Sequence, residues 1–592
     1  MAIALGCSSM MTSCTDYLTI YPTNEVIHEN FWKTAEDVNA MLASCYSSMA
    51  NNDIIQRMIV WGELRADNIM PRAGASNDLK YIVEANLLET NSYFKWEHFY
   101  KTINYCNLVL KYAPGVMNED PDFTQGDLDV IKGEAYALRA LCHFTLVRAF
   151  RDIPISLSAL DADDQDMTYP QYSPYVALDY IKADLDSAAK YCMNTGGWSA
   201  SEKNVSRITK NAVYAMRADV NLWRAAFAQY SIVSGDPVKY YSNDSTVLYK
   251  ENGYTPEDVN NFYTQVIEDC DSVIAITKRA IIKEYDDQNK TMIGLDTLNN
   301  PYFLCVNNPA IRDYPTIYDE IFCGVQQYGR EGYITPEEVI FKLDFNSSNS
   351  NGAVNGFYGY DKSSGSLIVP SKAPIALVGE LYKKSDSRYY SFTSIPRGGI
   401  SSDNKESYTI TKYTIKSANR VEGIQWYGNG KNYLDWIFYR KTDVLLMKAV
   451  ALAYRYKEAN GADIPGSDHN EAFRIVQTIN KRNISVMSDS LKPKDFKSKE
   501  NLQQLVYDER LRELTYEGKR WFDLVQKALY EGTTKNILDL VTKKLDSNEG
   551  AVKTKMSTIH TLFSPIYESE LILNPLLKQN PAFVRSTSTE KN

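Results

Sequence analysis

The sequence predicts a mostly α-helical fold, an α/α superhelical scaffold of tetratricopeptide-like helix pairs with a large irregular, loop-rich region and few short strands. Apolar residues recur at helical spacing through the first half of the chain and again near its end. Between them, residues 278–432 are rich in Tyr, Gly, Ser, Asn and Pro and show little sustained periodicity. So long an irregular stretch in a compact protein is usually functional.

The first half predicts a series of amphipathic helices. The clearest spans residues 133–150, where Ala135, Leu138 and Cys142 begin an apolar stripe. Another begins at Ser173, a suitable N-cap, because the proline that follows it fits the first helical position. The remaining helices of this half are expected at residues 37–49, 96–112 and 207–226. Helix pairs in series are typical of tetratricopeptide repeats, although the spacing here is not a strict repeat.

Helices are expected again at residues 437–456, 470–480 and 499–531, and the prolines of the tail favour an extended course. The predicted organisation is a signal-peptide remnant at residues 1–13, a helical region at 14–277, and a C-terminal region at 278–592. The C-terminal region contains the loop-rich insertion 278–432 and the closing helices. We expect the two regions to pack as one compact unit.

Composition excludes several partners. A net charge of −10 over 592 residues opposes nucleic-acid binding and docking on anionic lipid, both of which need a basic surface. The chain has 43 tyrosines, and most of them are expected to pack between helices. Some could instead form stacking platforms for a polar ligand, because tyrosine combines a flat apolar face with a polar tip.

The N-terminus predicts a lipid anchor. Residues 1–7 look like the end of a secretory apolar segment, and small residues precede both Cys7 and Cys14. Small residues before a cysteine suit a lipoprotein signal peptidase. Cys14 is the expected lipidated residue, because the first motif of the mature chain follows it directly. Beyond this segment, no apolar run reaches the roughly 18 residues that span a bilayer.

Motifs for chemistry are weak. No two of the five histidines lie close enough for a short metal motif, and His143 is expected to be a packing or hydrogen-bonded residue. No metal, cofactor or catalytic residue is predicted. Glu509, Glu513 and Glu517 recur every four residues and would form one helical stripe. Arginines at 510, 512 and 520 would keep these carboxylates ionised, which favours a structural ion-pair network over a glycosidase acid/base pair.

Several motifs in one order carry a family resemblance. They are WGELRADN at 61–68, the W-x3-Y-x2-I-x3-N pattern at 96–107, EAYALRA at 134–140, DIP at 152–154, ELTYEGKRW at 513–521 and the proline-containing tail at 565–581. Together they resemble the SusD/RagB family of outer-membrane nutrient-binding lipoproteins. Two departures, Lys448 to Val450 and Thr515, fall on predicted helices and affect local packing only.

The resemblance implies a non-enzymatic, cell-surface lipoprotein of the outer membrane. It would bind oligosaccharides and deliver them to a SusC-like TonB-dependent transporter, which it would cover like a lid. Some relatives take peptides instead, so a peptide-binding protein of the same fold and partner type stays open.

Two regions are candidates for ligand contact. The first, where the family often places such contacts, comprises Asp67, Asn68, Arg72 and Trp96. The second lies in the Tyr-rich loops and comprises Tyr314, Tyr318, Tyr328, Tyr358, Tyr360 and Trp426. Trp96 could equally serve as a helix-packing anchor, and each loop tyrosine could be a packing residue.

Overall fold

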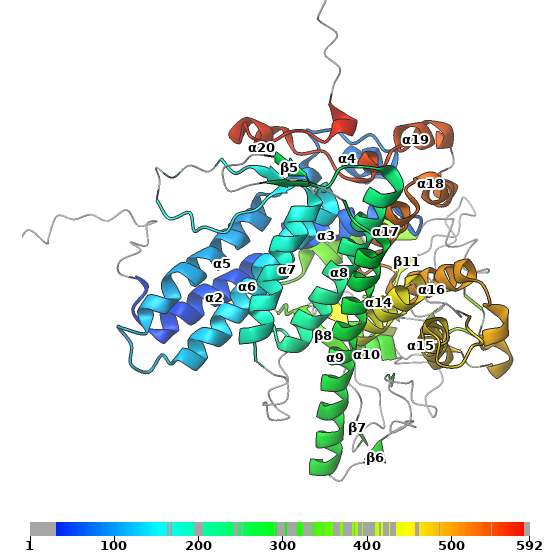
Figure 1. Cartoon of the computed structure of the whole chain (residues 1–592), viewed down its shortest axis with the longest axis horizontal. Helices are drawn as coiled ribbons and strands as arrows, with labels where there is room; N and C mark the ends of the chain where they lie inside the picture. Colours follow the sequence, from blue (N-terminus) through cyan, green and yellow to red (C-terminus); the bar gives the residue numbers. More distant parts are fainter. Residues whose placement is uncertain are drawn as a thin grey trace, which may run out of the picture.

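The computed structural model describes residues 31–193, 205–288, 338–358 and 434–584 with short gaps, together with short pieces elsewhere between 291 and 426. Helices dominate this part of the chain, and the strands form two-stranded pairs, which confirms the mostly α-helical prediction (Figure 1). Both Cys7 and Cys14 lie outside the described residues.

The first half is a row of helices packed side by side (Figure 1). Its helices are α2 (Ala35–Met49), α3 (Asn52–Ile59), the π-helix η2 (Val60–Leu64), α4 (Asn77–Val83), η3 (Ser92–Phe94), α5 (Glu97–Val116), α6 (Gln125–Phe150), α7 (Pro174–Tyr191), α8 (Lys210–Ser234) and α9 (Pro256–Gln288). The contacts run from α5 to α6, α7, α8 and α9 in order, as a tetratricopeptide-like scaffold requires.

Local sequence explains the helix ends. Thr34 and Asp37 form a capping box at the start of α2, and Thr124 and Asp127 form another at the start of α6. Pro174 occupies the first position of α7, as predicted.

The second half has shorter helices. They are α10 (Ile317–Cys323), α11 (Gly352–Tyr358), α14 (Lys441–Tyr454), α15 (Asp468–Asn483), η6 (Met487–Asp489), η7 (Pro493–Asp495), α16 (Lys499–Leu514), α17 (Arg520–Glu531), α18 (Lys535–Val541), η8 (Thr542–Lys544), α19 (Glu549–Lys555), η9 (Ile559–Leu562), α20 (Glu568–Leu573) and η10 (Pro581–Phe583). Of these, α14 packs on α9 and α17 packs on α8, which joins the two halves.

The strands are two to five residues long. They are β1 (Ile69–Pro71), β2 (Ile153–Pro154), β3 (Gln171–Tyr172), β4 (Lys239–Tyr241), β5 (Val247–Tyr249), β6 (Thr291–Met292), β7 (Tyr333–Ile334), β8 (Val339–Leu343), β9 (Ile368–Pro370), β10 (Thr393–Ser394), β11 (Thr409–Ile410), β12 (Lys416–Ser417), β13 (Gln425–Trp426) and β14 (Trp436–Arg440). β1 pairs antiparallel with β9, and β8 pairs antiparallel with β14 through a register shift.

Two predicted helix boundaries were wrong, and the long helix α9 was missed. Residues 436–440 form the buried strand β14 before α14 begins, because their aromatic and β-branched side chains suit a buried strand. The helix expected at 499–531 is two helices, interrupted where Tyr516 and Gly518 have φ of 69° and 73°. Helix α9 was not predicted, and it extends to Gln288, past the expected start of the loops at 278.

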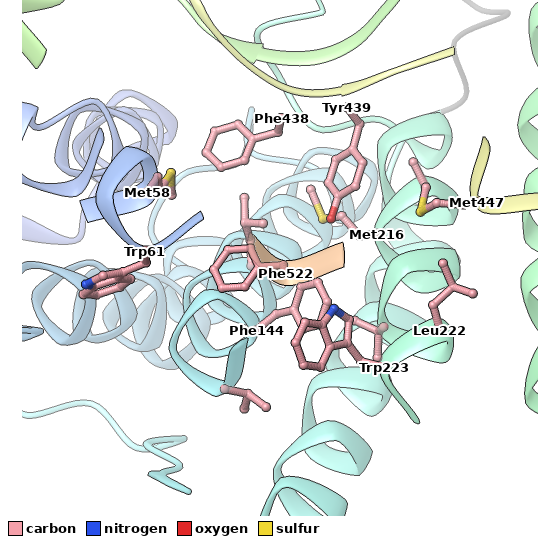
Figure 2. Packing of buried hydrophobic residues seen from close by; sticks show 14 of the residues in the cluster. Met58, Trp61, Phe144, Met216, Leu222, Trp223, Phe438, Tyr439, Met447 and Phe522 are labelled. Carbon is pink, nitrogen blue, oxygen red and sulfur yellow. The ribbon is translucent and has the colours of Figure 1, made fainter. Parts of the chain in front are cut away.

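One hydrophobic core cluster includes residues from Trp32 to Leu577. At its centre, Phe144 of α6, Trp223 of α8 and Phe522 of α17 lie together (Figure 2). The rings of Trp223 and Phe522 meet edge to face with centroids 6.2 Å apart. Aromatic packing therefore fixes α17, which begins with the last two residues of the motif at 513–521, against the N-terminal helices.

Candidate functional site

The motif at 61–68 packs directly against residues 515–521 of the motif at 513–521, and we call the contacts between these two segments the motif interlock. The backbones meet at Gly62 of η2 and Gly518. A Cβ atom on Gly62 would lie 1.9 Å from the carbonyl oxygen of Gly518, so no larger residue fits without a backbone shift. Gly518 itself has φ of +73°, a conformation that favours glycine.

Glu63 caps helix α17 from a distant part of the chain. Its Oε1 accepts hydrogen bonds from the backbone N–H groups of Gly518 at 2.9 Å and Lys519 at 3.1 Å. These amides lie at the start of α17, where Lys519 itself provides no side-chain cap. Burial raises the pKa of the Glu63 carboxyl to about 7, against the hydrogen bonds that favour its charged form.

Asp67 and Asn68 complete the interlock. The Asp67 carboxylate accepts two hydrogen bonds from the Arg520 guanidinium, at 2.8 and 3.0 Å, with both residues buried. Burial opposes ionisation of Asp67, but the charge of Arg520 prevails and holds its pKa below the usual value. The Asn68 amide donates to Thr515 Oγ1 at 3.1 Å and to the Glu63 carboxylate.

Two further cations hold the same segment. The Arg65 guanidinium lies 4.3 Å from the Trp521 ring centroid and donates to two backbone carbonyls near residue 562. The Lys544 ammonium donates to three backbone carbonyls of residues 64–69. Burial lowers the pKa of Lys544 to about 7 and that of Arg65 to about 9.

The three carboxylates Glu509, Glu513 and Glu517 form a buried ion-pair network, as predicted. Most of their partners, however, are cations other than the three arginines expected from the sequence. Arg388 pairs with Glu509 at 2.7 Å and with Glu513 at 2.9 Å. Arg440 pairs with Glu513 and Glu517, each at 2.7 Å. The other cations of the network are Arg482, 2.6 Å from Glu513, and Lys412, 2.6 Å from Glu517.

Of the three arginines expected as partners, only Arg512 contacts the stripe, at Glu509. Arg510 pairs instead with Asp443 and Asp523, and Arg520 pairs with Asp67. The stripe is also shorter than expected, because α16 ends at Leu514 and Glu517 lies in the following turn.

This network is unsuited to acid/base chemistry near neutral pH. Burial opposes the charge on Glu513 and Glu517, but the arginines prevail and lower the pKa of Glu513 well below its ordinary value. The pKa of Glu517 falls to about 2 in the same way. Both carboxylates therefore stay ionised and paired.

Among the second set of predicted ligand residues, two tyrosines are buried. The Tyr318 hydroxyl donates to Glu513 at 2.8 Å and so belongs to the network. The Tyr358 ring stacks on Tyr413 with centroids 5.3 Å apart and is buried completely. Tyr314, Tyr328 and Tyr360 lie outside the described residues, and Trp426 is described only through its strand β13.

In the first set, Trp96 is a packing anchor in this structure. It is 3% exposed, and its ring lies 5.0 Å from that of Phe150 and 5.6 Å from that of Tyr100. Asp67 and Asn68 are 1% exposed within the interlock. The structure thus brings Asp67 and Asn68 together, keeps Trp96 in a separate aromatic cluster, and leaves Arg72 half-buried at the surface.

Ligand contact by the ten candidate residues stays a prediction. Five of them are buried and offer little side-chain surface to a ligand: Asp67, Asn68, Trp96, Tyr318 and Tyr358. The interlock also has little space for a ligand. A cavity of about 30 Å³ beside it is lined by Arg148, Asp219 and Lys519 among others, which is room for a water and not for a sugar.

His143 is a buried packing residue, as predicted. Its Nε2 accepts the backbone N–H of Ser156 at 3.3 Å, and burial lowers its pKa to about 3. Within the described part of the chain, no helix combines the length and apolarity needed to cross a bilayer.

The fold and the interlocked motifs define a helical scaffold protein, and comparisons identify its family. The model described as "SusD family" matches residues 382–583, and the one described as "Starch-binding associating with outer membrane" matches residues 16–222. A SusD-like protein of Formosa agariphila is 24% identical and aligns over 98% of this chain and 97% of its own length. The chain belongs to the SusD/RagB family.

Solved structures agree on the fold. A SusD homologue from Bacteroides thetaiotaomicron superposes with a TM-score of 0.66 at 18% identity, covering 94% of this chain and 98% of that chain. A SusD superfamily protein from Bacteroides vulgatus gives a TM-score of 0.62 at 17% identity, covering 93% and 100%.

Proposed function

We propose that this protein is a cell-surface lipoprotein that binds oligosaccharides and delivers them to a TonB-dependent transporter of the outer membrane. The observation that carries the proposal is the match of two family models to the two ends of the chain, one of which is described as starch-binding and associated with the outer membrane. The proposed anchor is Cys14, and the proposed partner is a SusC-like barrel.

The structure supports a binding role through rigidity. The interlock and the ion network together hold the turn at 515–519 from two sides. Arg388 and Lys412, both within the loop-rich insertion, fix that insertion to α16 and the turn through buried ion pairs. A loop region attached in this way can present its exposed side chains to a ligand without a large ordering cost.

We propose the ligand face at the turn after β1 and on the loop-rich insertion. Arg72 stands first among the ten candidates, because its side chain is only half-buried and makes no hydrogen bond or ion pair with the described residues. The tyrosines of the insertion whose side chains are not described, Tyr314, Tyr328 and Tyr360, stay candidates with Trp426.

Two experiments test the proposal. Palmitate labelling in native cells should be lost in Cys14→Ala and kept in Cys7→Ala, which serves as the matched control. Purification of the labelled protein from mildly solubilised outer membranes should recover a TonB-dependent transporter as the main partner. Labelling that persists in Cys14→Ala and vanishes in Cys7→Ala would move the anchor, and recovery of the protein alone would count against the transporter.

Calorimetric titration with oligosaccharide and peptide pools tests the ligand class. Enthalpic binding of an oligosaccharide fraction is expected. Binding of peptides alone would replace the oligosaccharide proposal with the peptide-binding alternative.

A further inference from the structure

Arg72 has a backbone that the fold holds in place and a guanidinium group without a polar partner among the described residues. All other buried or half-buried arginines that the structure describes direct their guanidinium groups to carboxylates or to backbone carbonyls. The Arg72 guanidinium makes no hydrogen bond or ion pair within the described part of the chain, although its Nη1 is buried. A buried donor without a partner is costly, and more so when it is charged.

The backbone around Arg72 is fixed firmly. The Arg72 N–H donates to the Leu367 carbonyl at 2.9 Å, and the Arg72 carbonyl accepts from Ala75 at 3.0 Å. The preceding strand β1 pairs with β9, and Lys544 donates to the carbonyl of Ile69 at 3.2 Å. The backbone position of Arg72 is therefore set by the scaffold before any ligand arrives, so that only its side chain has to be ordered on binding.

The surroundings of Arg72 are accessible. Ala73 and Gly74 are exposed, and Leu367, to which the Arg72 backbone is bonded, is 37% exposed. A Cβ atom on Gly74 would meet nothing within 4 Å. The turn thus combines a half-buried arginine with exposed neighbours and open space at Gly74.

We propose, on the assumption that the proposed function holds, that the ligand carries an anionic group, a carboxylate or a sulfate ester, that pairs with the Arg72 guanidinium. The planar guanidinium matches such oxyanions with two parallel hydrogen bonds. A neutral hydroxyl would accept a hydrogen bond and leave the charge uncompensated. Because the whole chain carries a net charge of −10, long-range attraction cannot select an anion, and the selectivity has to come from this local pair.

Calorimetric titration of the full chain distinguishes the sources of such an anion. The probes are a uronic-acid oligosaccharide, a sulfated oligosaccharide, a neutral oligosaccharide of equal length and a glutamate-rich peptide. The variants are Arg72→Met, Arg72→Lys and the control Arg474→Met, which removes an exposed arginine of α15. We expect wild type to bind an acidic oligosaccharide, and Arg72→Met to weaken that binding roughly 10- to 100-fold.

The controls separate this inference from the proposed function. Arg72→Lys should retain part of the affinity, Arg474→Met should retain all of it, and the melting temperature should not fall in any of the variants. Wild-type binding of the neutral oligosaccharide, unaltered in Arg72→Met, would overturn the anionic inference and leave the proposed function standing. Binding of the acidic peptide alone, with dependence on Arg72, would keep the inference and overturn the oligosaccharide. Equal losses in Arg474→Met, or no binding of any probe, would overturn the inference.

Discussion

The motif interlock and the buried ion network hold the same turn, residues 515–519, but they are assembled differently. The interlock joins two continuous segments, 61–68 and 515–521, through backbone contact, a helix cap and one ion pair. The network collects its charges from segments spread between residues 338 and 517. Short motifs therefore contain the residues of the first arrangement, whereas most cations of the second can be identified only in the folded chain.

The two arrangements should also differ in what they contribute to stability. In the network, Arg388, Arg440 and Arg482 each neutralise two or more buried carboxylates. Removal of one of these arginines leaves unpaired charges in a medium of low dielectric. In the interlock, close packing and backbone hydrogen bonds dominate, and the loss of one contact leaves the others in place. The predictions that follow test this difference, from the largest effect to the smallest.

Arg440→Met should cause the largest loss of stability. Arg440 pairs with Glu513, Glu517 and Glu338, and all four residues are buried. Removal of one partner from a buried ion pair costs about 3–5 kcal/mol. Urea unfolding at pH 7 should measure that loss in the free energy of unfolding. A loss below about 1 kcal/mol would mean that the network tolerates an unpaired charge and that the contrast with the interlock is false.

Glu63→Gln should change the pH dependence of stability. Because burial raises the folded pKa to about 7, the folded chain keeps a proton that the unfolded chain releases near its ordinary pKa of 4.5. Stability from this proton is fully present below pH 4.5 and is lost as the pH rises through 7, which amounts to about 3 kcal/mol.

The glutamine variant still accepts the Gly518 and Lys519 amides but cannot titrate. The decrease in unfolding free energy between pH 5 and pH 8 should therefore be smaller in Glu63→Gln than in wild type by an amount of that order. Glu568→Gln, at an exposed position, provides the control. An identical pH slope in wild type and Glu63→Gln would contradict the raised pKa. It would show that the Glu63 carboxylate stays ionised across this pH range, the form that its backbone N–H donors favour.

Gly62→Ala tests the backbone contact of the interlock. The added Cβ would meet the Gly518 carbonyl at 1.9 Å, and overpacking of this kind typically costs about 1–3 kcal/mol. Gly550→Ala in α19 meets nothing within 4 Å, and a helical glycine replaced by alanine should gain about 0.5–1 kcal/mol. Thermal melts should move in opposite directions for the two variants. A Gly62→Ala protein as stable as wild type would show that the two backbones are free to separate.

The sequence could predict most of the fold because helical periodicity and caps are local signals. Strand β14 was not predicted, because its burial depends on pairing with β8, which is distant in the sequence. The end of α16 was not predicted, because the positive φ of Tyr516 also arises from distant packing. Helix α9 was a missed signal, because its buried Val266, Cys270 and Val273 recur at helical spacing.

The candidate site was less predictable than the fold. Asp67, Asn68 and Trp96 were predicted as ligand contacts, which stays a prediction. Their packing partners in the structure, Arg520, Thr515 and Phe150, lie far away in the sequence. The role of Glu63 as a cap of α17 also depends on that contact. Arg388 and Lys412, which fix the insertion, sit in a stretch without periodicity, so nothing local marked them.

Lys448→Met should have the smallest effect and completes the comparison with Arg440. Like Arg440, Lys448 contacts more than one carboxylate: Asp271 and Glu471 each lie at 2.6 Å. Those partners are 53% and 37% exposed, so water can stabilise them when the cation is removed, whereas Glu513 and Glu517 have no access to water. Methionine keeps the apolar length of the side chain, and a loss of only about 0–1 kcal/mol is expected. Urea unfolding of both variants in the same buffer, with and without 0.5 M NaCl, gives the ratio of the two losses. Comparable losses would mean that the number of ion pairs, and not the burial of their carboxylates, determines what a cation contributes in this protein.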